Sequence, residues 1–528
     1  MCTTPCSSVP GARRFASGLL LLALVGTAAR SSEAQLAIFE VLSLDSPAVN
    51  EAADEGDRFG DALAAGDFNG DGWYDLAFGV PGGEVFTILG AGRVQVLYGS
   101  PEGLGTEGQQ TLTQGALGPN PIEVSDGFGH ALVAGDFDGD GYHDLAVGVP
   151  GEDLGEAHDA GVVDVFYGGM NGLDQDSLQR WSQDSGGLAG AAQFGDNFGS
   201  RLTVGDFNGD DRDDLVVAAI FDDVVGSNAA GVVHVIFGTP DGLDGSDSRR
   251  LRQGFGGLSE TAEAGDFFGS GLAAGDFDGD GTDDLAIGAL GEDLPAGDDA
   301  GLVIVISGHP SGLLLGSAEE FTKPGLGAVK SGAEYGDEFG AALAAGDFDR
   351  DGYEDLAVGH PGEVISGAGL GEGAVTVLRG SEDGITTAQS IILHQEVDGV
   401  GGEAADFDRF GEVLASGDLD NDGYTDLVVG APFDDILANV DPGRVHVFYG
   451  TAEGISVAGD QDFVIAPFAD EHFGGALAIG PFGAGFVLAA AKPAADISGE
   501  LDAGSVVVMR SDEIFSDNFE SGAVERWD

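Results

Sequence analysis

A block of about seventy residues recurs along the chain and constrains its fold more than any other feature. It first reads AAGDFNGDGWYDLAFGVP from Ala64, and its first aspartate returns at intervals of 69 to 71 residues. A seventh, degenerate copy spans Leu477 to Phe482. A steady period of this length, without long helical patterns, indicates a solenoid or a propeller. The six leading aspartates are Asp67, Asp136, Asp206, Asp276, Asp347 and Asp418.

Each copy has the periodicity of short strands. In the second copy the runs 128–133, 145–148 and 161–168 are rich in β-forming residues and are bounded by Gly, Pro and Asp, which is typical of hairpins. A weaker fourth strand precedes the next Phe-Gly pair. Four strands in each of seven copies predict an all-β, seven-bladed β-propeller, in which radial repetition protects the sheet edges. A β-helix needs a much shorter repeat, and no long helical stripe is present.

These copies resemble the FG-GAP repeat of integrin α-subunit propellers and of many secreted bacterial proteins. The resemblance covers about residues 57–509, and the Gly-x-Pro element is clearest at 148–150, 359–361 and 430–432. It implies the propeller fold, with ligand-binding loops on the face opposite the acidic hairpins. We see no pattern for integrin leg domains, a membrane span or a large inserted domain, so we expect integrin-specific biology not to carry over. The Phe-Gly pairs begin at Phe59, Phe128, Phe198, Phe268, Phe339, Phe410 and Phe473.

Six acidic loops follow the pattern D-x-[DN]-x-D-G-x-x-D. Oxygen ligands at alternate positions suit a hard cation, and flexible high coordination favours Ca²⁺ over Mg²⁺. Positions 1, 3, 5 and 9 offer side-chain oxygens, and position 7 offers a backbone carbonyl. We therefore predict about six structural Ca²⁺ ions that tie the strands of each blade, in place of disulfides. The ligand sets are Asp67, Asn69, Asp71, Trp73 and Asp75; Asp136, Asp138, Asp140, Tyr142 and Asp144; Asp206, Asn208, Asp210, Arg212 and Asp214; Asp276, Asp278, Asp280, Thr282 and Asp284; Asp347, Asp349, Asp351, Tyr353 and Asp355; and Asp418, Asp420, Asp422, Tyr424 and Asp426.

Two other interpretations of these loops are open. An EF-hand needs flanking helices and Glu at position 12, whereas position 12 from Asp67 is Phe78, in a β-run. Metal-free acidic turns would leave four carboxylates repelling one another within nine residues. We expect the third loop to be the weakest site, because Asp211 replaces the turn glycine. The seventh hairpin, 481–485, has no acid and should bind nothing.

The N-terminus has the features of a signal peptide over residues 1–34. Arg13 and Arg14 precede an apolar run, Leu19 to Val25, and Ala34 ends a small-x-small cleavage motif. We expect a secreted protein, extracellular, at the cell surface or periplasmic, with the general secretory and twin-arginine routes both open. The propeller then spans 35–511, and 512–528 forms a short tail of open role. Cys2 and Cys6, the only cysteines, lie in the leader.

The segment 36–42 predicts how the ring closes. It precedes the first Phe-Gly pair. Before every other Phe-Gly pair, the segment at this position is the outer strand of the preceding copy. We expect it to pair beside residues 505–509 in the seventh blade, which removes an open sheet edge.

The charge of the chain excludes several partners. Twenty Lys and Arg against 92 Asp and Glu give a net charge of −72, which excludes nucleic-acid binding through phosphate contacts and disfavours anionic membranes. No later run of about 18 apolar residues predicts a membrane span. Many acids follow the Gly-x-Pro position, and they form either a solvated surface or a face for a cationic or Ca²⁺-bridged partner. These acids include Glu152, Asp153, Asp222, Asp223, Glu292, Asp293, Asp434 and Asp435.

We expect a non-enzymatic adhesion or ligand-binding module, monomeric, for an extracellular protein or glycan. The alternative is a glycan-active enzyme such as a polysaccharide lyase, which needs a basic residue beside sugar-stacking aromatics. The lysines are few, at 323, 330 and 492, and the histidines are scattered over different repeat positions. His143, at position 8 of the second loop, should face solvent, and the aromatic residues at position 7 should pack.

Overall fold

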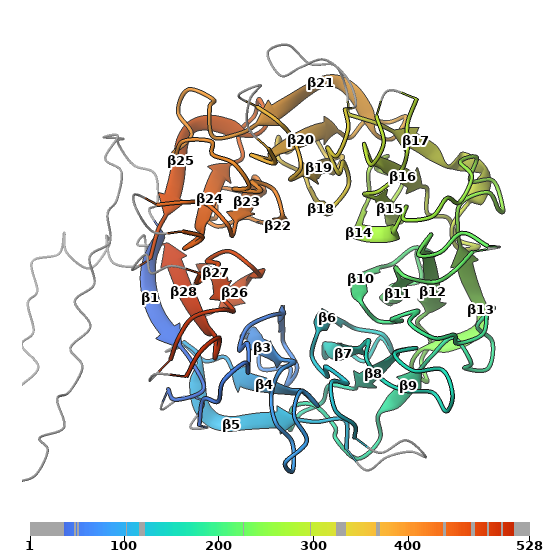
Figure 1. The fold of residues 1–528 in the computed structure, drawn as a ribbon, viewed down its shortest axis with the longest axis vertical. Coiled ribbons are helices and arrows are strands. Elements are labelled where there is room, and N and C mark those ends of the chain that lie inside the picture. Colours follow the sequence, from blue (N-terminus) through green and yellow to red (C-terminus); the bar gives the residue numbers. More distant parts are fainter. Residues whose placement is uncertain are drawn as a thin grey trace, which may run out of the picture.

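The computed structural model describes residues 36–46, 49, 52–101, 103–115, 122–224, 226–295, 297–323, 334–365, 370–436, 440–465, 470–482, 485–497 and 500–511. The predicted signal peptide and the tail lie outside these residues. Seven four-stranded sheets stand around a ring (Figure 1), and their strands pair antiparallel. The predicted seven-bladed propeller is confirmed. Within the described ranges the one helical element is the short 3-10 turn η1 (Leu315–Ser317), and no helix there is long and apolar enough to cross a membrane.

Each blade runs from an inner strand near the ring axis to an outer strand at the rim (Figure 1). Blades 1 and 2 comprise β2 (Leu63–Gly66), β3 (Asp75–Val80), β4 (Arg93–Tyr98) and β5 (Gly105–Leu112), then β6 (Ala131–Gly135), β7 (Asp144–Val149), β8 (Val162–Phe166) and β9 (Gln179–Trp181). Blades 3 and 4 comprise β10 (Arg201–Gly205), β11 (Asp214–Ala219), β12 (Val232–Phe237) and β13 (Asp244–Leu251), then β14 (Phe268–Gly275), β15 (Asp284–Ala289), β16 (Leu302–Ile306) and β17 (Glu319–Phe321). Blades 5 and 6 comprise β18 (Ala342–Gly346), β19 (Asp355–His360), β20 (Ala374–Arg379) and β21 (Thr386–Leu393), then β22 (Val413–Gly417), β23 (Asp426–Ala431), β24 (Arg444–Tyr449) and β25 (Ser456–Phe463).

The seventh blade draws on both ends of the propeller. Its strands are β26 (Leu477–Phe482), β27 (Gly485–Lys492), β28 (Ser505–Ser511) and, as the outer strand, β1 (Leu36–Leu42). β1 pairs antiparallel with β28, with Leu42 opposite Val506, so the first and last strands lie side by side in Figure 1. The predicted ring closure is confirmed.

The core lies between neighbouring blades. The second strand of each of the first six blades is buried along its whole length, because a blade is covered on both faces, and this explains the continuous apolar runs. One cluster joins Phe137 and Val163 of blade 2 to Phe198 and Leu215 of blade 3.

The Phe-Gly pairs follow from this packing. The phenylalanine rings fill the layer between two blades; Phe128 and Phe198, for example, are fully buried. The backbones also approach closely, because a Cβ on Gly148 would stand 2.1 Å from the carbonyl oxygen of Gly199. Gly199 itself has φ of +90°, a conformation that favours glycine.

Candidate metal sites

The acidic loops join the first and second strands of blades 1 to 6, and their own backbones orient the carboxylates. In the second loop, Asp136 accepts the N–H groups of Asp140 at 3.1 Å and Gly141 at 2.9 Å. Asp138 accepts the N–H of Asp140 at 3.1 Å, and Asp140 accepts that of Tyr142 at 3.0 Å. These contacts hold the side chains in place, and in this loop oxygens of Asp136, Asp138 and Asp144 converge.

Four loops bring three carboxylate oxygens within 4.8 Å of one another. Such oxygen-only groups fit a hard cation of the Ca²⁺ type. The first and third loops carry Asn69 and Asn208 at position 3 instead, so an amide oxygen takes one of these places. The converging sets are Asp136, Asp138 and Asp144; Asp276, Asp278 and Asp280; Asp347, Asp349 and Asp351; and Asp418, Asp420 and Asp426.

The aspartate at position 9 ties each loop to the third strand of its blade. Asp144 accepts the N–H of Phe137 at 2.9 Å with one oxygen and that of Gly168 at 2.8 Å with the other. Burial raises the pKa of Asp144 to about 8, and it does the same for Asp75 and Asp426. A cation in the loop would offset the desolvation that favours the protonated form.

The third loop differs in its internal contacts. Asp211 stands at φ of +63° at the position where the other five loops have glycine, and Asn208 turns its amide toward Asp214 at 3.4 Å. Arg212 forms an ion pair with Asp210 at 3.3 Å. These contacts neutralise part of the loop from within, and the weakness of this site stays a prediction.

Position 8 connects neighbouring loops, a role that the sequence reasoning missed. The prediction that His143 faces solvent is wrong, because its ring points at the preceding loop and packs against Tyr74 with 5.3 Å between ring centroids. The sequence signal for this role was that position 8 carries side chains able to accept a hydrogen bond, such as His143, Asp213 and Asp283. The contacts are Asp67 N–H to His143 Nδ1 (2.9 Å), Asp136 N–H to Asp213 Oδ2 (2.7 Å) and Asp206 N–H to Asp283 Oδ2 (2.9 Å).

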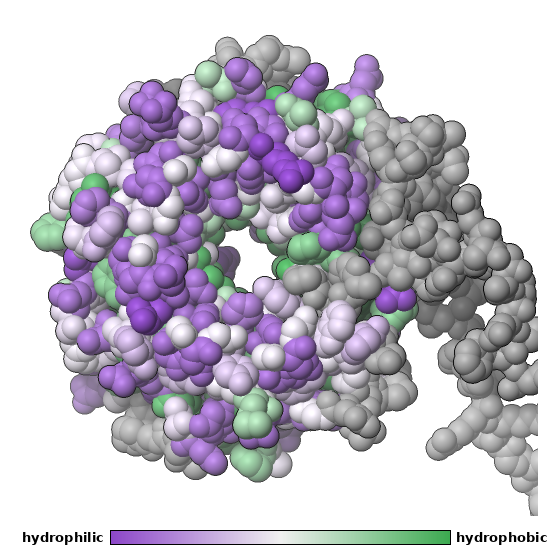
Figure 2. Space-filling view, turned by 180° about the vertical axis from the view of Figure 1, so that it is seen from behind, coloured by the Kyte–Doolittle hydropathy of each residue, from purple (hydrophilic) through white to green (hydrophobic). Residues whose placement is uncertain are grey.

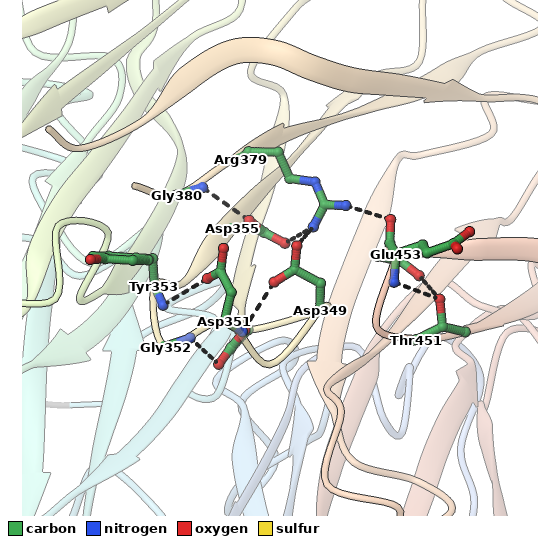
Figure 3. A network of polar contacts seen from close by, with 11 residues as sticks. Asp349, Asp351, Gly352, Tyr353, Asp355, Arg379, Gly380, Thr451 and Glu453 are labelled. Atoms are coloured by element: carbon green, nitrogen blue, oxygen red, sulfur yellow. Dashed lines mark hydrogen bonds and ion pairs between the residues drawn. The ribbon is translucent and has the colours of Figure 1, made fainter. Parts of the chain in front are cut away.

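The fifth loop holds a basic side chain that no loop spacing predicts. Arg379, at the end of β20, donates from Nη1 to Asp349 at 2.6 Å and to Asp355 at 2.9 Å (Figure 3). Its Nη2 donates to the carbonyl of Glu453, in the next blade, at 2.7 Å. An alignment of the repeats would have revealed this arginine, because none of the residues at the same position in the other blades with an acidic loop is basic. Those residues are Tyr98, Tyr167, Phe237, Ser307 and Tyr449.

The acids after the Gly-x-Pro position divide into two groups. The acids stand in adjacent pairs, and the first of each pair, namely Glu152, Asp222, Glu292 and Asp434, is buried. The interpretation of these four as part of an exposed binding face is therefore wrong. Each accepts a hydrogen bond from a glutamine at the end of the preceding blade's outer strand, and so clasps two blades together. The pairs are Gln114 with Glu152, Gln183 with Asp222 (2.6 Å), Gln253 with Glu292 (2.5 Å) and Gln395 with Asp434.

The second acid of each pair lies nearer the surface and shapes its loop. Asp223 and Asp293 are exposed, and they accept the N–H groups of Ala229 and Asp299 at 3.0 and 2.9 Å. The loop of Asp223 also carries an aromatic ring two residues earlier, that of Phe221. Phe221 is 42% exposed and packs edge-on against Phe267 at 5.6 Å.

The central opening carries a mixed set of charges. Figure 2 shows this opening on a face dominated by hydrophilic residues. Burial lowers the pKa of Arg201 in blade 3, and the carboxylates of Glu412 and Asp61, at the entries to blades 6 and 1, partly offset this. Burial lowers the pKa of His130, at the same level of the ring, to about 4.

Comparison with known proteins agrees with this architecture. Six segments match the FG-GAP repeat, at residues 59–97, 128–166, 198–236, 268–306, 339–378 and 410–448. The chain is an FG-GAP repeat protein. Its propeller is integrin-α-like, and each match begins at a Phe-Gly pair and ends in the third strand of a blade.

The FG-GAP chain has relatives of more than one kind. Integrin alpha-PS2 of Drosophila melanogaster is 32% identical over 238 residues, which is 44% of this chain and 15% of the relative. Phosphatidylinositol-glycan-specific phospholipase D of Mus musculus is 32% identical over 183 residues, 35% of this chain and 21% of the relative. The chain thus matches about a fifth or less of these proteins. The solved rhamnogalacturonan lyase YesW aligns with a TM-score of 0.39 and 14% identity, over 86% of this chain and 72% of that one, and this likeness carries no argument.

Proposed function

We propose that this FG-GAP propeller is a secreted, calcium-binding module that binds an extracellular protein or glycan without chemical turnover. The binding surface in this proposal is the post-GAP face, defined by Asp153, Asp223, Asp293, Asp435 and Phe221. Ca²⁺ in the hairpin loops is structural, because the loop oxygens converge inward and the loops contact one another. The proposal places the protein outside the cell, which the signal-peptide features of residues 1–34 support.

The observation that carries the proposal is the presence of exposed carboxylates and of an exposed aromatic ring, that of Phe221, on rigidly held loops. The buried glutamine–acid clasps fix the base of these loops, so the exposed residues lie on a stable scaffold. Phe433 likewise packs against His472 with 4.8 Å between ring centroids, next to the loop that carries Asp435. Carboxylates beside aromatic faces suit a partner with basic groups, through ion pairs and cation–π contacts.

Charge reversal tests the proposal. The variant Asp153→Lys, Asp223→Lys, Asp293→Lys and Asp435→Lys should lose binding to the extracellular proteins or glycans that retain the wild-type protein on arrays. Its Ca²⁺ content should remain unchanged, because these residues lie outside the hairpin loops. The matched control reverses four exposed acids elsewhere: Asp176, Asp241, Glu382 and Glu453. Equal binding by both variants would refute the surface assignment.

A glycan-active enzyme is the competing function. The test is to incubate the wild-type protein with acidic polysaccharides. If it releases new reducing or unsaturated ends, the protein is an enzyme and not a binding module.

A further inference from the structure

The fifth acidic loop differs from the others in what lies between its carboxylates. Its oxygens converge as closely as those of the second, fourth and sixth loops. In the fifth loop, however, a guanidinium nitrogen stands 2.6 Å from the oxygen of Asp349 and 2.9 Å from that of Asp355. Those are positions 3 and 9, two of the four side-chain ligands that a cation in this loop would need.

The fourth loop supplies the direct comparison. It has the same four aspartates, but the residue that corresponds to Arg379 is Ser307. There the space beside Asp278 and Asp284 is a cavity of about 230 Å³, which Ser307 lines. In the fifth blade the side chain of Arg379 extends over the equivalent carboxylates (Figure 3).

The arginine is held in place by more than the loop. It is only 14% exposed at the side chain, and its second nitrogen donates to the carbonyl of Glu453 in blade 6 at 2.7 Å. Glu453 follows Thr451, whose hydroxyl donates to Gly454 and shapes that turn. The guanidinium therefore has partners on both sides of a blade boundary, and removing it from the loop would break bonds in both blades.

We propose that Arg379 is the resident cation of the fifth loop, so that this loop does not bind Ca²⁺ under conditions that fill the fourth and sixth. A fixed positive charge beside two ligand oxygens takes up a lone pair of each and repels a divalent ion. The fifth blade is thereby stapled without metal, and the number of ions is one lower than the count of acidic loops. This inference rests on the proposed calcium binding of the other loops.

Two reciprocal substitutions test the inference on the mature chain. Arg379→Ser copies the fourth blade into the fifth, and Ser307→Arg copies the fifth blade into the fourth. Native mass spectrometry with added CaCl₂, after removal of metal by EGTA, counts the bound ions. We expect Arg379→Ser to bind one Ca²⁺ more than the wild type and Ser307→Arg to bind one fewer.

A second pair of variants covers the case in which Arg379→Ser does not fold. Asp349→Ala in the wild-type background should leave the Ca²⁺ count unchanged, whereas Asp420→Ala, at the same position of the sixth loop, should lower it by one. The inference is overturned if Arg379→Ser and the wild type bind the same number of ions, or if Asp349→Ala loses one. A wild-type protein that binds no Ca²⁺ at all would instead refute the proposed calcium binding, so the two failures are distinguishable.

Discussion

Replacing Leu42 with alanine should weaken the closure of the ring by a predictable amount. Leu42 is fully buried at the end of β1, opposite Val506, and packs in a cluster with Leu44 and Phe59. Truncating a buried leucine costs about 2–5 kcal/mol, from lost transfer free energy and the cavity left behind. We expect about 3 kcal/mol, because neighbours from three strands surround the site and limit its collapse.

The melting temperature gives the readout. An unfolding entropy of about 2.1 cal/mol/K per residue, over a ring of about 480 residues, amounts to about 1 kcal/mol/K. The Leu42→Ala variant should therefore melt about 3 °C below the wild type, by calorimetry in saturating Ca²⁺. The control is Val41→Ala, on the same strand but with a side chain that is 37% exposed, which should shift melting by less than about 1 °C. Equal shifts for the two variants would mean that β1 does not close the ring in solution.

Three further predictions address the metal, the clasps and pH. Adding excess EGTA should lower the melting temperature by several degrees, since each ion held at a hundred times its Kd stabilises the fold by about 2.7 kcal/mol; an unchanged melting curve would contradict structural Ca²⁺. Gln253→Ala removes the hydrogen bond to buried Glu292 and should lower the free energy of unfolding by about 1–3 kcal/mol, measured by urea titration against the exposed control Gln175→Ala. Burial raises the pKa of Asp266 to about 6 and that of Asp408 to about 7, above the ordinary value near 4. The folded state then binds more protons than the unfolded chain between about pH 4 and 7, so the metal-free protein should lose stability as pH rises through that window; a melting temperature that rises with pH there would refute this.

The repeat spacing predicts most of the fold for a physical reason. A blade cannot bury its faces alone, so the period of the sequence is the period of the packing, and the Phe-Gly pairs mark each blade boundary. The same reasoning places β1 in the last blade, because the segment 36–42 occupies the outer-strand position of the repeat. The acidic loops are local in sequence, and their convergence follows from spacing alone.

Contacts between blades could not be predicted in this way. Arg379 reaches Asp349 across thirty residues and Glu453 across a blade boundary, and spacing within one loop contains no information about either. The buried acids after the Gly-x-Pro position were misinterpreted for a similar reason. Glu292 looks like a surface charge in sequence, and only its distance from Gln253 shows that it is part of the packing between blades.

The pairing of β1 with β28 also sets the order in which the molecule can be completed. Of the propeller strands, the ribosome makes β1 first and its partner β28 last, with six blades made in between. Until β28 emerges, β1 has no sheet to join, and the flank of blade 7 that it covers does not exist. Earlier blades can pack on one another as they appear, but the ring stays an open arc, with the apolar face of a terminal blade exposed at each end. Those faces invite contact with other chains, so the protein is most prone to aggregate before β28 is made and becomes resistant once β1 and β28 pair.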